Sequence, residues 1–194
     1  MVYHSFIKQE ESRVMSKQLF FNDKMVLCYF LIILAVASRL LPHPVNFASI
    51  GALGLFSGAY LLDRRAWLIP LVALFISDVF IGFYDVLVML SVYFSFALSA
   101  IIGRLLLSRK RSVYAIGGSA VITATILFVL SNFALWTTGL YYPMTADGLI
   151  QCYLLAIPFY GNSIIGDVFY SAVLFGVYEG ILYILSKHQD AHAT

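Results

Sequence analysis

Residues 86–107 are VLVMLSVYFSFALSAIIGRLLL, a run in which Arg104 is the only charged side chain. A helix needs roughly 20 residues to cross the hydrocarbon core of a bilayer, so this run alone is long enough. The rest of the chain has the same character, because 61% of its residues are hydrophobic, only 11% are charged, and mean hydropathy is +0.89. These values lie outside the range of soluble domains. The sequence therefore predicts one integral membrane domain.

Six apolar segments are candidates for crossing the bilayer. They are Lys24–Leu41, Phe47–Leu62, Ala66–Phe83, Val86–Leu107, Val113–Trp136 and Ile164–Leu185. The second segment is short for a span. We predict an all-α bundle of six transmembrane helices over residues 24–186, with a mobile cytoplasmic arm before it (1–23) and a cytoplasmic tail after it (187–194).

A seventh apolar segment, Leu149–Tyr160, is about a dozen residues long and therefore too short to span. Pro158 lies near its end and would interrupt a regular helix. We predict an additional short re-entrant or interfacial helix on the outer side. Its two possible roles are a lid over a site and a loop that packs the bundle.

The basic residues indicate the orientation of this bundle. Lys and Arg accumulate on the cytoplasmic side of membrane proteins. The six-span arrangement leaves only Arg39, of the twelve Lys and Arg residues, on the other side. We therefore predict a multi-pass protein of the bacterial inner membrane with both termini in the cytoplasm. Cys28 and Cys152 would then lie a membrane's width apart, too far for a disulfide.

Most polar residues within the apolar segments map to the outer end. Charge within hydrocarbon is expensive and usually marks a functional site. A buried carboxylate also needs a partner, so we expect Arg39 to pair with Asp78 or Asp167 inside the bundle. A structural ion pair and direct contact with a ligand are compatible roles for this trio.

A ligand site is predicted from the same end of the bundle. Asn132 and Trp136 are one turn apart on the fifth span and can face a common cavity. The complete predicted substrate-binding set is Asn132, Trp136, Asp78, Asp167, Tyr142 and Asn162. Because Trp and Tyr are also enriched at membrane interfaces, simple anchoring is the alternative role for Trp136 and Tyr142.

Small residues form a stripe on the second segment. Gly51, Gly54 and Gly58 would allow another helix to approach closely. Two interpretations remain open, namely internal packing and a docking face for a separate membrane protein.

Several catalytic patterns are absent from the sequence. It contains no phosphate-binding Gly-x-x-x-x-Gly-Lys loop, no His-Glu-x-x-His, no Gly-x-Ser-x-Gly and no paired cysteines. The cluster Arg109-Lys110-Arg111 is first of all a topology signal. We therefore expect neither an enzyme nor a resident cofactor, metal or nucleic-acid partner.

Three segments resemble a family of uncharacterised bacterial six-helix transport-type proteins. They are RLLPHPVNF from Arg39, Ser131-Asn-Phe-x-x-Trp136, and PFYGNSIIGD from Pro158 to Asp167, and the resemblance extends to about Gly180. That family is similar in size and topology to the substrate-binding components of energy-coupling-factor vitamin transporters. The resemblance implies a vitamin site near the outer face, for which cobalamin is one candidate. It also implies a transmembrane coupling protein with ATPase subunits as a partner.

The sequence thus predicts a membrane transport protein that binds a small nutrient, a vitamin or cofactor precursor, at an outer site in the lipid bilayer. Two alternatives belong to other classes. A stand-alone proton-coupled carrier would titrate Asp78, Asp167 or Glu179. A structural or assembly membrane protein would bind no ligand.

Overall fold

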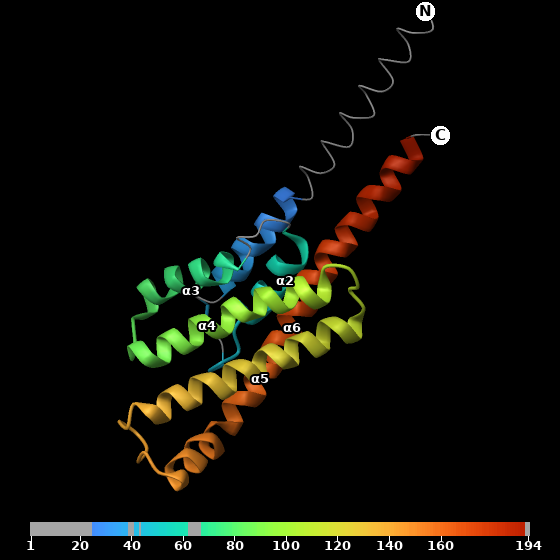
Figure 1. Cartoon of the computed structure of the whole chain (residues 1–194). Helices are drawn as coiled ribbons and strands as arrows, with labels where there is room; N and C mark the ends of the chain where they lie inside the picture. Colours follow the sequence, from blue (N-terminus) through green and yellow to red (C-terminus); the bar gives the residue numbers. More distant parts are fainter. Residues whose placement is uncertain (1–24, 39–40, 43, 62–66, 193–194) are drawn as a thin grey trace, which may run out of the picture.

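The computed structural model describes residues 25–38, 41–42, 44–61 and 67–192, and the side chains as far as residue 187. The predicted arm (1–23) and Arg39 lie outside these ranges. Within them the chain forms six helices and no strand (Figure 1). The helices are Met25–Ser38, α2 (Ile50–Tyr60), α3 (Leu68–Ile81), α4 (Val86–Ile102), α5 (Val113–Thr137) and α6 (Ala146–His192). A π-helical segment, η1 (Gly103–Leu107), continues α4.

Three of these helices are long and apolar enough to cross a membrane. They are α4 with η1 (22 residues), α5 (25 residues) and the part of α6 from Ala146 to Lys187 (42 residues). Their outward faces carry large apolar side chains, as expected for contact with lipid. The predicted all-helical class is confirmed for the described residues, and the length and composition of these three helices agree with a membrane protein. The helix Met25–Ser38, α2 and α3 are apolar but shorter, with 10–17 residues each.

The predicted separate helix at Leu149–Tyr160 is wrong, because this segment is the N-terminal part of α6. Pro158 lies inside the helix and removes one backbone hydrogen bond. Side chains hold both flanks of the proline against α5. The Tyr153 hydroxyl donates to the carbonyl of Val129 (2.7 Å), and the Tyr160 and Thr125 hydroxyls share a hydrogen bond (2.8 Å). Packing on α5 therefore overrides the local signal for a break.

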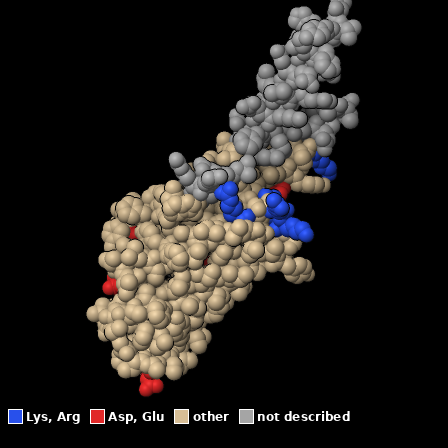
Figure 2. All heavy atoms as spheres, in the orientation of Figure 1, with Lys and Arg blue, Asp and Glu red and all other residues tan. Residues whose placement is uncertain are grey.

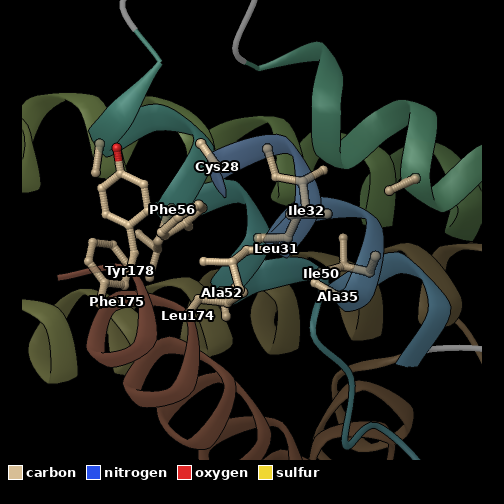
Figure 3. Packing of buried hydrophobic residues seen from close by; sticks show 14 of the residues in the cluster. Cys28, Leu31, Ile32, Ala35, Ile50, Ala52, Phe56, Leu174, Phe175 and Tyr178 are labelled. Atoms are coloured by element: carbon tan, nitrogen blue, oxygen red, sulfur yellow. The ribbon is translucent and has the colours of Figure 1, made fainter. Parts of the chain in front are cut away.

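The core of the molecule is α2. Ten of its eleven residues are buried, and it contacts α3, α4, α5 and α6. A helix that is apolar all round is stable only when it is surrounded. Figure 3 shows Phe56 of α2 beside Phe175 and Tyr178 of α6, with ring centroids 5.4 Å apart in both pairs.

The second predicted span, Phe47–Leu62, is shorter in the structure than the sequence indicates. Asn46 has a left-handed backbone (φ 64°) in a turn closed by the Phe47 N–H and the Pro44 carbonyl (3.0 Å). The helix begins only at Ile50, so α2 extends over about 16 Å, half the thickness of a bilayer core.

The glycine stripe of α2 is used for internal packing. A Cβ on Gly51 would collide with the Asp167 carboxylate, one on Gly54 with Ser99, and one on Gly58 with the backbone of Ala100. All three glycines are buried. The docking interpretation is therefore wrong for this face, because the chain's own α4 and α6 cover it.

Charge is distributed unequally between the two ends of the bundle. Figure 2 shows the Lys and Arg side chains gathered at one end. We call this the basic end; its described residues are Arg104, Arg109, Lys110, Arg111 and Lys187. The opposite end, where α4 and α6 begin, carries Asp85 and Asp147, and we call it the acidic end.

Candidate functional site

The N-terminus of α2 lies inside the bundle, where water is not available to its free N–H groups. The N-cap residue, Ser49, is fully buried and makes no side-chain cap. Its hydroxyl instead donates to the carbonyl of Ala35 (2.6 Å). The cap comes from α6, because the Asp167 carboxylate accepts the Ala52 N–H (3.2 Å). A negative charge at this position also interacts favourably with the helix dipole.

Asp167 is the most notable polar group of the interior. It is 4% exposed and also accepts from the Thr123 hydroxyl of α5 (3.4 Å). Gly51 allows the carboxylate to lie directly against α2, because no other residue would leave room for it. Among the described residues, only the Ala52 N–H and the Thr123 hydroxyl donate hydrogen bonds to Asp167, and no basic side chain pairs with it.

A second buried polar group follows one helical turn later. Ser171 is fully buried, and its hydroxyl has no hydrogen-bond partner within the described structure. Residues four apart on a helix share a face, so Ser171 lies on the same side of α6 as Asp167. We call Thr123, Asp167, Ser171 and the Ala52 N–H the interior polar site. A buried hydroxyl without a partner is costly, and it is a natural contact for a ligand group or a water molecule.

Asp78 lies in α3 and is 1% exposed. The Tyr93 hydroxyl of α4 donates to it at 2.9 Å. The contact joins α3 to α4 and was not apparent from the sequence. The predicted ion pair with Arg39 falls outside the described residues and stays a prediction.

Asn132 and Trp136 make hydrogen bonds near the acidic end. The Asn132 amide donates to the Phe128 carbonyl in its own helix (2.7 Å), and the Cys152 thiol of α6 donates to the Asn132 backbone carbonyl (3.4 Å). The indole N–H of Trp136 donates to the Pro143 carbonyl (3.1 Å), which ties the connection between α5 and α6 to α5.

The remaining members of the predicted set lie elsewhere. Tyr142 is half-buried in the connection between α5 and α6. The Asn162 amide donates to the Val45 carbonyl (3.0 Å) and so fixes the segment that leads into α2. Cys152, the neighbour of Asn132, is about 22 Å from Asp167 along a helix. The predicted residues therefore form an interior group and an acidic-end group, not one compact cluster.

The basic end contains a polar cluster that sequence reasoning missed. The Tyr60 hydroxyl donates to Glu179 (2.6 Å), Arg111 pairs with the same carboxylate (3.6 Å), and the guanidinium lies 4.4 Å from the Tyr60 ring centroid. The three residues come from α2, α6 and the segment before α5. No spacing rule links such distant positions.

Comparison with known proteins places the chain in a family. The model of a family of unknown function, DUF6580, matches residues 20–189, and the chain belongs to this family. No curated protein and no solved structure matches it.

Proposed function

We propose that this member of DUF6580 is a membrane transport protein that binds a small, partly polar nutrient and carries it inward. The observation that supports this best is the buried Asp167 carboxylate, which meets only neutral groups among the described residues. An ionisable residue inside a membrane bundle indicates a functional site. In known transporter folds, helices that begin within the membrane direct their N-termini at substrate. α2 begins inside the bundle in the same way.

We also propose that the chain crosses the membrane six times. α2 is too short to cross alone, but irregular backbone at membrane depth is tolerated where protein surrounds it. Residues 44–49 and α2 would together make the second crossing, since α2 is buried by the other helices. The positive-inside rule then places the basic end and both termini in the cytoplasm, in a bacterial inner membrane.

The ligand would enter from the outer, acidic end. Ligand sites are mostly apolar, with a few polar groups that fix orientation. On the path from this end, Trp136 and Tyr142 would supply aromatic surface and Asn132 and Asn162 amide groups. The interior polar site would supply a carboxylate and a hydroxyl at the place where the ligand comes to rest. Vitamins and cofactor precursors have this mixed character. The N-terminal part of α6, which contains Leu149–Tyr160, would cover the site from the side.

Uptake against a concentration gradient requires a source of energy, and the sequence contains no phosphate-binding Gly-x-x-x-x-Gly-Lys loop. A transmembrane coupling protein with ATPase subunits would supply it, as in energy-coupling-factor transporters. Such a partner cannot dock on the glycine stripe of α2, which is closed, so it would use the exposed apolar faces of the outer helices. In a stand-alone proton-coupled carrier, Asp167 would be the proton-carrying group.

A structural or assembly protein is the second candidate. The observation in its favour is that Asp167, Asn132, Trp136 and Asn162 all bond to groups of the chain itself. In that account Asp167 only caps α2. The buried Ser171 hydroxyl, which has no hydrogen-bond partner in the described structure, is then a loss of stability that the helix packing tolerates.

A binding screen separates these accounts. The full chain in detergent would be heated with individual vitamins and cofactor precursors, and unfolding would be followed by intrinsic fluorescence. We expect at least one compound to stabilise the wild type and Asp85→Asn, but not Asp167→Asn. Asn can still accept the Ala52 N–H, so the variant should keep its fold. Asp85 caps α4 at the surface, where Asn serves equally well.

Two outcomes contradict the proposal. If no compound stabilises the wild type, the structural account is favoured. If a compound stabilises all three proteins equally, the nutrient site does not include Asp167.

A further inference from the structure

The basic end contains a pocket of about 460 Å³ that the proposed nutrient site does not use. It lies between the C-terminal end of α2 and η1. The residues that matter for its chemistry are Gly58, Leu61, Arg104, Leu105, Ser108 and Arg109. Two arginines and a serine therefore line the same cavity as apolar residues.

The fold forms this pocket through close contact between two backbones. A Cβ on Gly58 would collide with the carbonyl of Ala100 and the N–H of Arg104, and one on Gly103 with the backbone of Leu55. α2 and η1 are thus locked together at this level. η1 is π-helical, and single π-helical turns within α-helices are frequent at functional sites. Backbone of α2 and η1 in direct contact thus forms this wall of the cavity.

The neighbouring arginine, Arg111, is already engaged. It pairs with Glu179 and covers the Tyr60 ring, so its charge serves the structure. Arg109 is exposed and lines the pocket, whereas Lys110 does not line it. This difference between adjacent basic residues provides a specific test.

The pocket places basic, hydrogen-bonding residues beside an apolar surface. A ligand that fits it should have a phosphate group next to an apolar part. Arginine and serine donate hydrogen bonds to phosphate oxygens. Leu105 is 74% exposed and Leu106 50% exposed, so an apolar surface begins directly beside the basic groups. Basic pockets between helices near the cytoplasmic surface accommodate the head groups of anionic lipids.

We propose that this pocket binds the head group of an anionic phospholipid, with the phosphate near Arg109 and Ser108 and the acyl chains along Leu105. A soluble phosphate compound would satisfy only the polar half of the pocket. The site is separate from the interior polar site and does not depend on nutrient transport.

Native mass spectrometry of the full chain in detergent tests the proposal. The probes are phosphatidylglycerol and phosphatidylcholine with identical acyl chains, and glycerol 3-phosphate as the soluble phosphate compound. We expect phosphatidylglycerol to be retained more strongly than phosphatidylcholine, and glycerol 3-phosphate not to be retained. Arg109→Gln should lower phosphatidylglycerol retention about fivefold, and Lys110→Gln much less.

A second variant tests the apolar half. Leu105→Gln keeps every charge and should still weaken phosphatidylglycerol retention. Equal effects of Arg109→Gln and Lys110→Gln would overturn the proposal, because they would indicate a diffuse surface charge. Equal retention of the two lipids would overturn it as well, and retention of glycerol 3-phosphate would assign the pocket to soluble phosphates instead.

Discussion

Replacing Gly58 by alanine should destabilise the protein, because α2 is enclosed by the chain itself. The added methyl group would collide with the carbonyl of Ala100 and the N–H of Arg104. Both are backbone groups, so no rotation of a side chain can relieve the contact. α2 would have to move away from α4 and η1, both of which pack against it.

The magnitude follows from two opposing effects. Overpacking in a filled core typically costs about 1–3 kcal/mol, and a backbone collision belongs to the upper part of that range. Alanine is favoured over glycine within a helix by about 1 kcal/mol, which offsets part of the cost. We expect a net loss of about 1–2 kcal/mol in the free energy of unfolding. For a chain of this size that corresponds to roughly 2–8 °C in Tm.

The measurement is thermal unfolding in detergent, with Gly176→Ala as the matched control. Gly176 is an exposed glycine within α6, and a Cβ there meets nothing within 4 Å. The control should be neutral or slightly stabilised, because only the helix-propensity gain applies. If Gly58→Ala and Gly176→Ala unfold at the same temperature, α2 is not packed against α4 as the structure shows.

Three further predictions concern the cap, the acidic end and the orientation. Asp167→Ala should lower the free energy of unfolding by about 1–3 kcal/mol, because it leaves the buried Ala52 N–H unsatisfied. Asp167→Asn should lower it clearly less, and equal losses of stability in thermal unfolding would refute the capping role. Trp136→Phe removes the donor to Pro143 and should speed amide hydrogen exchange in residues 138–145, and an unchanged rate would show that this bond does not hold the connection. In intact cells, a membrane-impermeant thiol reagent should label Asp147→Cys but not Arg109→Cys, and the reverse pattern would invert the proposed topology.

Two of the long helices were predictable from sequence almost to the residue. The runs Val86–Leu107 and Val113–Trp136 correspond to α4 with η1 and to α5. Their starts are set by local chemistry, because Asp85 accepts the N–H groups of Leu87 and Val88, and Ser112 accepts that of Ala115. Length, apolar composition and a capping residue act together here, and all three are visible in the sequence.

The course of α6 was not predictable in the same way. Pro158 and Gly161 favour an interruption, and the local rule failed because tyrosines on both sides of Pro158 bond to α5. Likewise, the composition of α2 is that of a helix surrounded by lipid. Only the three-dimensional arrangement shows that protein, not lipid, surrounds it.

The candidate site was likewise predictable only in part. Sequence reasoning selected Asp167 and Asn162 as unusual polar residues, but not their partners. Asp167 contacts a residue 115 positions away, and Asn162 one 117 positions away. The carboxylate of Glu179 meets Tyr60 across 119 positions. Helical spacing links residues three or four apart, so contacts between distant segments require the fold.

The most direct test of nutrient binding is to identify what the protein retains when it is extracted from its own membrane. Small molecules released from the purified full chain would be identified by mass spectrometry, with an Asp167→Asn preparation processed in parallel. We predict one partly polar compound that accompanies the wild type in a near-constant ratio to protein and is strongly depleted in the variant. Two equally empty preparations, or the same compound at the same level in both, would contradict the account.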